Sequence, residues 1–293
     1  MNDNHTVNPV DKHQVRKAFS RSAAGYDQVA VLQREIGDRM LERLDYIKAK
    51  PAVVLDAGAG TGHCSAGLLN RYKEATVISL DFALPMLQKA RKQGSWLRRP
   101  GCLCADIEQL PLADESVDMV FSNVAIQWCT DLQHTFAEFM RVLKPEGLLM
   151  FSTFGPDTLK ELRQSWAVAD GTDRPRTSRF IDMHDIGDMM VHSQFADPVI
   201  DAERMTLTYE KVTGLVRDLK TLGAHNAASD RPRGMTGKQR WQAMETAYEQ
   251  FRDDGRLPAT YEIVYGHAWR PRQLKQVTVN GEVHVPIDLL RGR

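Results

Sequence analysis

The chain has 293 residues, of which 42% are hydrophobic, and its 38 basic and 38 acidic side chains give a formal net charge of zero. A chain of this length can bury a sizeable core without disulfides, and a neutral one is a poor candidate for binding nucleic acid, which needs clustered Lys and Arg. The apolar runs fall short of the roughly 18 residues of a membrane span, and the first residues lack a secretory signal. The four cysteines form no CxxC pair and have no histidine at ligand spacing. We therefore expect a cytoplasmic protein without metal, membrane or nucleic-acid partners.

The amino-terminal part predicts helices, and the part after Pro51 predicts a sheet. Apolar side chains at helical spacing indicate two helices over residues 11–48, interrupted at residues 20–27. Short apolar runs then alternate with helical patterns, which is typical of parallel βαβ units. The predicted strands are residues 53–55, 76–80, 102–105, 119–122 and 148–153, and the predicted helices between them include residues 85–92 and 132–143.

After Gly155 the alternation becomes less regular. The pattern predicts helices over residues 157–168 and 183–192, mainly helical structure over 210–256, and strands over 199–209 and 259–269. An Asn280-Gly281 pair between alternating valines predicts a hairpin over residues 277–285.

The segment VVLDAGAGTG, residues 53–62, contains the most informative motif. It places Asp56 at a strand end and then Gly58, Gly60 and Gly62 at the start of a helix, where glycines let a ligand approach the backbone. The G-x-G-x-G spacing differs from the dinucleotide-binding G-x-G-x-x-G, and the carboxylate of Asp56 would repel a pyrophosphate. A cationic ligand is favoured there, and S-adenosylmethionine, with its ammonium and sulfonium groups, suits the site. The alternative is a tight glycine turn that only packs a helix on the sheet.

Two further aspartates end the next predicted strands. Asp81 stands where an acidic residue binds ribose hydroxyls in a doubly wound sheet. Asp106 is placed to accept a hydrogen bond from the adenine amine, and Ile107 to flank the ring. A lone aspartate at a strand end is usually a helix cap, but three on consecutive strands indicate a ligand crevice. The predicted cofactor-binding residues are Asp56, Gly58, Gly60, Gly62, Asp81, Phe82, Met86, Asp106, Ile107 and Asn123.

Several motifs resemble known families. The stretches LDAGAGTG, SLDFALPML, ADIEQLPL, SNVAIQWCTD and RVLKPEGLLMFSTFG resemble class I S-adenosylmethionine-dependent methyltransferases. A closer resemblance, to the malonyl-acyl-carrier-protein O-methyltransferase family of biotin synthesis, covers nearly the whole chain. It is carried by the stretches AAGYDQVAVLQ, NVAIQW, STFGPDTLKEL, and GAHNA followed by ATYEIVYGHA. The resemblance implies an α/β, Rossmann-like fold with a seven-stranded, mostly parallel sheet. It divides the chain into an N-terminal helical cap (1–50), a cofactor-binding core (51–155), the remaining strands with helical lid insertions (156–271) and a hairpin tail (272–293).

The resemblance also implies a reaction, in which S-adenosylmethionine methylates the free carboxylate of a malonyl thioester on acyl carrier protein, and S-adenosylhomocysteine is the product. A carboxylate is ionised near neutral pH, so no general base is required. The sequence shows no Ser-His-Asp or Cys-His constellation, which agrees. Catalysis would come from removing water from the carboxylate and holding its oxygen in line with the methyl group.

On the acceptor side, Arg179 is the leading candidate to bind the carboxylate, because a guanidinium suits bidentate contacts. The alternative, that Arg179 is an exposed arginine without a role in the site, is equally open. Tyr26 is placed to close over the methyl donor, and the alternative is a tyrosine buried in the core. His225 could line the lid, and the alternative is a structural role. The predicted catalytic residues are Tyr26, Gln127, Trp128, Phe154, Arg179 and His225.

Two other functions stay open on the sequence alone. One is methylation of another small molecule, such as a free carboxylic acid or a quinone precursor, and the other is a non-catalytic S-adenosylmethionine-binding module. Acyl carrier proteins are acidic as a family, so the implied partner needs a basic docking face. The densest basic stretch is residues 217–240, which has six Lys or Arg, although a solvated helix face is the alternative.

Overall fold

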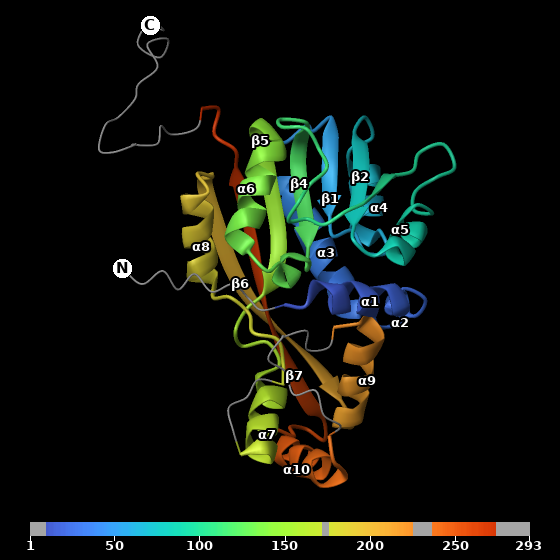
Figure 1. Ribbon diagram of the computed structural model, residues 1–293, viewed down its shortest axis with the longest axis vertical. Coiled ribbons are helices and arrows are strands. Elements are labelled where there is room, and N and C mark those ends of the chain that lie inside the picture. Colours follow the sequence, from blue (N-terminus) through green and yellow to red (C-terminus); the bar gives the residue numbers. More distant parts are fainter. Residues whose placement is uncertain (1–9, 172–175, 225–235, 274–293) are drawn as a thin grey trace, which may run out of the picture.

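The computed structural model describes residues 10–171, 176–224 and 236–273. It contains a seven-stranded sheet with the strand order β3-β2-β1-β4-β5-β7-β6, in which β7 runs antiparallel to both of its neighbours and the other pairs are parallel (Figure 1). This arrangement confirms the predicted Rossmann-like α/β fold. The strands are β1 (Val53–Ala57), β2 (Thr76–Asp81), β3 (Gly101–Cys104), β4 (Val117–Asn123), β5 (Leu143–Phe154), β6 (Ala196–Tyr209) and β7 (Leu257–Trp269).

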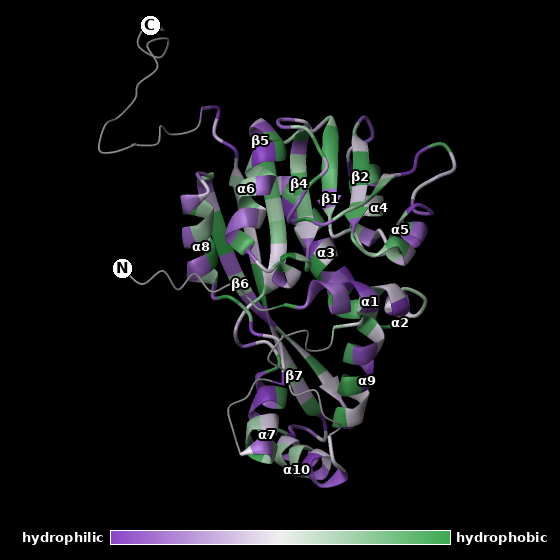
Figure 2. Ribbon diagram, viewed as in Figure 1, coloured by the Kyte–Doolittle hydropathy of each residue, from purple (hydrophilic) through white to green (hydrophobic). Residues whose placement is uncertain are grey.

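Helices cover both faces of the sheet, because successive strand residues point to opposite faces. Val54 packs with α3 and α4 in one core, and its neighbour Leu55 packs with α6 and α8 in the other. The central strands are strongly apolar (Figure 2), as expected for strands buried on both sides. The helices are α1 (Lys12–Ser22), α2 (Tyr26–Val29), α3 (Val31–Arg43), η1 (Leu44–Tyr46), α4 (His63–Arg71), α5 (Leu84–Ala90), η2 (Ile126–Trp128), α6 (Leu132–Val142), α7 (Lys160–Asp170), α8 (Met183–His192), α9 (Val212–Leu222) and α10 (Lys238–Glu249).

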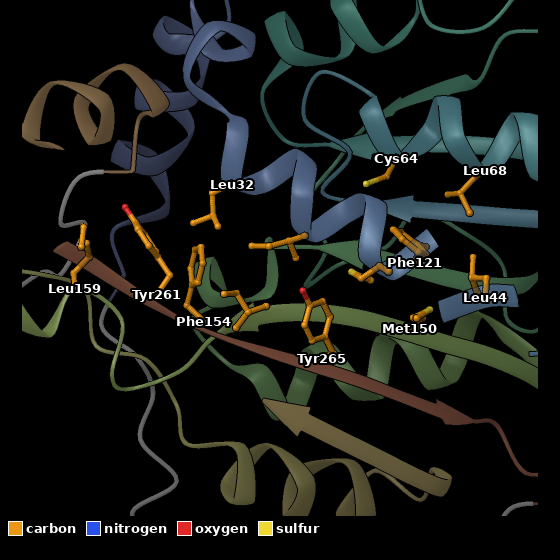
Figure 3. Close-up of a cluster of buried hydrophobic side chains, with 14 of the residues drawn as sticks. Leu32, Leu44, Cys64, Leu68, Phe121, Met150, Phe154, Leu159, Tyr261 and Tyr265 are labelled. Carbon is orange, nitrogen blue, oxygen red and sulfur yellow. The ribbon is translucent and has the colours of Figure 1, made fainter. Parts of the chain in front are cut away.

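The long strands β6 and β7 extend past the other strands and carry α7, α9 and α10 beyond the sheet (Figure 1). Helix α7 packs on α10, where the rings of Trp166 and Trp241 lie 6.0 Å apart. One core joins this extension to the sheet: Figure 3 shows Phe154 and Tyr261 in the same cluster as residues of α3 and β4. The acceptor-side side chains therefore stand on a continuous apolar support.

The helix predicted at residues 157–168 begins three residues later, at Lys160. The reason is a contact with β7: the backbone N–H groups of Gly155 and Asp157 donate to the carbonyl and the carboxylate of Glu262, respectively. Leu159 then adopts a left-handed backbone conformation with φ of 55° before the helix starts. The chain between β5 and α7 is thus fixed by a tertiary partner 105 residues away.

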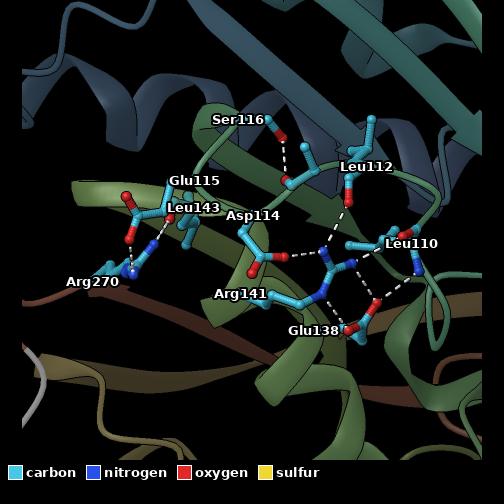
Figure 4. A network of polar contacts seen from close by, with 10 residues as sticks. Leu110, Leu112, Asp114, Glu115, Ser116, Glu138, Arg141, Leu143 and Arg270 are labelled. Carbon is cyan, nitrogen blue, oxygen red and sulfur yellow. Dashed lines mark hydrogen bonds and ion pairs between the residues drawn. The ribbon is translucent and has the colours of Figure 1, made fainter.

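Arg141 of α6 fixes the loop that follows β3. Its guanidinium donates to the carbonyls of Leu110 and Leu112 and pairs with Asp114 and Glu138 (Figure 4). The loop held in this way includes Asp106, one of the residues predicted to bind a cofactor.

No helix in the described part of the chain is long and apolar enough to cross a membrane. The predicted hairpin at residues 277–285 and the predicted site residue His225 lie outside the described residues.

Candidate active site

The glycine loop joins β1 to α4, and its three glycines have positive φ angles of 81°, 55° and 87° at Gly58, Gly60 and Gly62. A Cβ atom at Gly58 would overlap that of Ala125, and one at Gly62 would lie 2.7 Å from Cα of Ala90. A Cβ atom at Gly60 would meet no atom within 4 Å. The outer glycines are therefore required by packing, whereas the middle one borders open space that a ligand can fill.

That space is a cavity, open to solvent, at the carboxyl ends of β1, β2, β3 and β4. Nine of the ten residues predicted to bind the cofactor line it; the exception is Gly62. Parallel neighbours bring their carboxyl ends to one edge of the sheet, which explains why residues far apart in the sequence meet here.

Asp56 is the most deeply buried acid of the cavity, with 1% of its surface exposed. Its Oδ2 accepts a hydrogen bond from the hydroxyl of Ser65, and its Oδ1 has no hydrogen-bond partner among the described residues. Burial raises the pKa of Asp56 to about 7. A buried acceptor without a partner is costly, so a cationic or N–H-donating ligand in this cavity would stabilise it.

Asp81 connects the glycine loop to the end of β2. Its two carboxylate oxygens accept hydrogen bonds from the backbone N–H groups of Gly60, at 2.9 Å, and Ala83, at 2.8 Å. Burial raises its pKa to about 6. Each carboxylate oxygen has two acceptor sites, so Asp81 can hold the loop and still accept hydrogen bonds from a ligand in the cavity.

Polar contacts at two ends fasten the amino-terminal helices over this cavity. At one end, Lys12 of α1 forms an ion pair with Asp106, at 2.6 Å. At the other end, Asp27 of α2 accepts a hydrogen bond from the hydroxyl of Thr61 at 2.6 Å and forms an ion pair with Lys89. The sequence pattern does not indicate a role for Lys12, Asp27 and Thr61, because only tertiary packing brings α1 and α2 to the strand ends.

Aromatic side chains lie between these contacts. The ring of Phe19 packs against Trp128, with centroids 5.5 Å apart, and against Tyr26, at 6.5 Å. All three line the cavity. Burial and the nearby carboxylate of Asp81 raise the pKa of Tyr26 above its ordinary value, so its hydroxyl stays protonated and can donate a hydrogen bond.

A second cavity, also open to solvent, meets the first at Gln33 and Trp128, which line both. Its walls are aromatic: Phe154 lies 5.6 Å from Phe180 and 5.8 Å from Tyr261 between ring centroids. Gln127 also lines it. We call this space the acceptor cavity and the first one the cofactor cavity.

Gln33 is a junction residue that the sequence analysis did not assign, although it ends the quoted stretch AAGYDQVAVLQ. Its backbone carbonyl accepts a hydrogen bond from the side chain of Asn123, which also lines the cofactor cavity. Its side-chain Oε1 is buried and has no hydrogen-bond partner in the described ranges. An amide in this position is available to a ligand that spans the two cavities.

The structure places Arg179 away from this junction. The side chain is exposed and lines a third cavity, which shares only Gln127 and Phe180 with the acceptor cavity. Arg176 does line the acceptor cavity, but its guanidinium is paired with Asp170. Among the described residues, no group of three or more His, Cys, Asp or Glu is arranged to hold a metal ion.

The seven-stranded sheet with a glycine loop after β1 has the fold of the class I methyltransferases. The model of the methyltransferase domain family matches residues 55–151. Among solved structures, the chain is similar to the YcgJ protein of Bacillus subtilis, with a TM-score of 0.57 and 16% identity, over 80% of this chain and 100% of that one. It is also similar to phosphoethanolamine N-methyltransferase 2 of Haemonchus contortus in complex with S-adenosyl-L-methionine, with a TM-score of 0.53 and 17% identity, over 86% of this chain and 57% of that one.

Curated relatives are far more similar in sequence. The chain is 57% identical over 268 residues to the malonyl-[acyl-carrier protein] O-methyltransferase of Gallionella capsiferriformans, covering 89% of this chain and 92% of that protein. It is 49% identical over 287 residues to the enzyme of the same name from Halorhodospira halophila, covering 97% of each. The chain belongs to the malonyl-[acyl-carrier protein] O-methyltransferase family.

Proposed function

We propose that this enzyme works in the cytoplasm and uses S-adenosylmethionine to methylate the free carboxylate of malonyl-acyl carrier protein. The products are the methyl ester and S-adenosylhomocysteine, and the reaction is an early step of biotin synthesis. The observation that carries this proposal is the similarity to malonyl-[acyl-carrier protein] O-methyltransferases. It extends over 89–97% of the chain, well beyond the matched methyltransferase domain at residues 55–151.

The cofactor cavity fits the proposed methyl donor, which supplies an electrophilic methyl group on a positively charged sulfur. The unpartnered oxygen of Asp56 offers a negative charge to a cationic ligand, and the open space at Gly60 lets the ligand lie against the backbone. We assign Asp81 to the ribose hydroxyls, and Phe82 and Ile107 to the faces of the adenine ring; all three line the cavity.

The acceptor cavity suits a carboxylate nucleophile that needs no base. The aromatic walls formed by Phe154, Phe180 and Tyr261 exclude water, and a carboxylate with fewer water contacts is a stronger nucleophile. We assign the hydroxyl of Tyr26 and the side-chain amide of Gln33 to orient the carboxylate. They replace Arg179 in this role, because Arg179 lines neither cavity, whereas Tyr26 lines the cofactor cavity and Gln33 lines both.

The remaining assignments concern the walls and the lid. We assign Gln127 and Trp128 to the wall that faces the transferred methyl group, since both line the acceptor cavity. We also propose that the helical insertions among the remaining strands of residues 156–271, which include α7, α9 and α10, act as the substrate lid over the core at residues 51–155.

The absence of a general base predicts a flat pH profile. At saturating cofactor, kcat should be constant from about pH 6 to 9, because a carboxylate acceptor with an ordinary pKa near 4 is ionised throughout. A steep rise through neutrality that disappears in Tyr26→Phe would show that a base is needed and that the acceptor is not a carboxylate.

A panel of acceptors with methyl-labelled S-adenosylmethionine tests the function directly. The panel contains malonyl-acyl carrier protein, malonyl-pantetheine, free malonate and a quinone precursor, with acetyl-acyl carrier protein as the matched control that lacks a free carboxylate. Label should enter the malonyl thioesters as an alkali-labile ester and be absent from the acetyl control. Label on the quinone precursor would assign a different methyltransferase, and no S-adenosylhomocysteine release with any acceptor would indicate a non-catalytic module.

A further inference from the structure

Helix α1 presents one basic face to solvent. Val15 and Ala18 are buried, and on the opposite side of the helix Arg16, Lys17 and Arg21 are exposed. The helix contains no Asp or Glu. Within the described part of the chain, none of these three cations forms an ion pair.

Helix α9 carries two further exposed cations next to α1. It packs beside α1 and α2 (Figure 1), so closely that a Cβ atom at Gly223 would lie 2.9 Å from the hydroxyl oxygen of Ser22. Its Arg217 and Lys220 are exposed and also form no ion pair with any residue that the structure describes. We call the following five side chains the α1–α9 basic surface: Arg16, Lys17, Arg21, Arg217 and Lys220.

The α1–α9 basic surface borders the place where the two cavities meet. On one side, Phe19 of α1 lines the cofactor cavity and packs on Trp128, which lines both cavities. On the other side, Lys220 lines the acceptor cavity. The basic stretch expected at residues 217–240 is divided instead, because Lys238 and Arg240 belong to α10, which packs on α7.

We propose that the α1–α9 basic surface is the docking site for the acyl carrier protein and binds acidic side chains on it. This inference rests on the proposed function, because it assigns the partner that delivers the acceptor. These five cations lie on two neighbouring helices and form no described ion pair, and Asp218 is the one acid on these helices, so the net positive charge there favours an acidic partner. Complementary charge near a cavity mouth also steers the partner and raises the encounter rate.

Charge reversal tests the surface. In Arg16→Glu/Lys17→Glu/Arg21→Glu, the KM for malonyl-acyl carrier protein should rise about tenfold or more at low salt, since rim charges act mainly on association. The KM for malonyl-pantetheine and the affinity for S-adenosylhomocysteine should stay unchanged, because these side chains do not line either cavity. The wild-type KM for the carrier protein should rise with salt, and that of the variant should depend on salt much less.

The matched control is Lys48→Glu/Lys50→Glu/Lys73→Glu, which makes the same change of charge. These lysines are exposed and precede β1 and β2, at the edge of the sheet opposite the cavities. The control should keep the wild-type KM for both substrates. The neutral variant Arg16→Gln/Lys17→Gln/Arg21→Gln should raise the KM for malonyl-acyl carrier protein less than charge reversal does. This graded result would show that lost electrostatic attraction, and not damage to the helix, causes the effect.

Three results would overturn the docking site: an unchanged KM for the carrier protein, an equal loss on malonyl-pantetheine, or an equal loss in the lysine control. Direct binding of the carrier protein with an unloaded arm separates this proposal from the proposed function. Suppose that charge reversal weakens binding of the carrier protein but the wild type methylates neither malonyl substrate. The proposed function would then be refuted, and the proposed docking site would still hold. Reversal-sensitive binding to DNA or to anionic vesicles, without binding to the carrier protein, would assign the surface to another partner.

Discussion

The cofactor cavity and the acceptor cavity meet at Gln33 and Trp128 but are built in opposite ways. The floor of the cofactor cavity comes from the ends of neighbouring strands, and its polar groups are held by backbone hydrogen bonds, as at Asp81. The acceptor cavity comes from segments spread between α2 and β7, and aromatic side chains form its walls.

The difference follows from what each cavity has to do. A ligand with a fixed positive charge and ribose hydroxyls is recognised by carboxylates at fixed positions, so small errors in geometry are costly. A nucleophile that is already ionised needs removal of water and correct orientation, which apolar walls and one or two donors provide. Changes in the cofactor cavity should therefore act on binding in a nearly all-or-none way, and changes in the acceptor cavity should be graded.

The largest expected effect is at Gly60. Gly60→Val places a branched side chain in the open space of the cofactor cavity, and affinity for S-adenosylhomocysteine, measured by calorimetry, should fall by more than about 100-fold, or roughly 2.7 kcal/mol. Gly255→Val is the control, because Gly255 has a similar φ of 71° and equally open surroundings but lies in a turn before β7. Equal losses of affinity in both variants would mean that backbone strain, and not the ligand, explains the effect.

The next effect is at Asp81. Asp81→Ala removes a charged acceptor, and the affinity for the cofactor should fall by about 1.5–3 kcal/mol, which is roughly 10- to 150-fold. Asp118→Ala is the matched control: Asp118 also accepts from two backbone N–H groups, those of Ala52 and Val53, but at the opposite end of the sheet. The control should lose thermal stability and keep cofactor affinity. If the control lost as much affinity as Asp81→Ala, the role of Asp81 would be structural alone.

The same contrast explains what the sequence could predict. Asp56 and Asp81 were assigned because each directly ends a short apolar strand, and the parallel sheet brings such ends together. Gln33 was not assigned, because a helical glutamine shows its role only when α3 packs on the sheet. Arg179 is predicted at the acceptor from its residue type and its place in the first lid insertion, just before Phe180, and neither of these determines the direction of its side chain.

Tertiary contacts explain the remaining differences in the fold. The strand and helix pattern predicted the sheet, since hydrophobic periodicity records burial. It did not predict the late start of α7, which depends on hydrogen bonds to Glu262 on β7. Nor did it predict the division of the basic stretch at residues 217–240, because helices that follow each other in the chain pack on different neighbours.

A smaller effect is expected in the acceptor cavity. Phe154→Leu should raise the KM for malonyl-acyl carrier protein by about fivefold, or roughly 1 kcal/mol, because part of one apolar wall is lost. Affinity for S-adenosylhomocysteine should not change, because Phe154 does not line the cofactor cavity. Phe136→Leu is the control for core packing, since Phe136 is fully buried in the core on the other face of the sheet. A rise in KM of the same size in Phe136→Leu would remove Phe154 from the acceptor wall.

The last effect concerns stability and not ligand binding: it is a pH dependence of the free energy of unfolding that originates at Asp56. In the folded, ligand-free protein, burial raises the pKa of this carboxyl group from its ordinary value of 3.8 to about 7. Between these two values, the folded state holds a proton that the unfolded state has released. The free energy of unfolding must therefore fall as pH rises from about 4 to about 7, because stability falls with pH wherever the folded state binds more protons.

Asp56→Asn removes this titration and leaves that of Asp81, whose pKa of about 6 acts in the same direction. The melting temperature of the ligand-free wild type should decline from pH 5 to pH 8 by about 5–10 °C more than that of the variant, because the two pH units below a pKa of about 7 correspond to roughly 2.7 kcal/mol, at about 2–4 °C per kcal/mol. Saturating S-adenosylmethionine should reduce the difference, because its positive charge favours ionised Asp56. If the melting temperatures of the two ligand-free proteins changed equally with pH, Asp56 would already be ionised in the folded state without a cationic ligand.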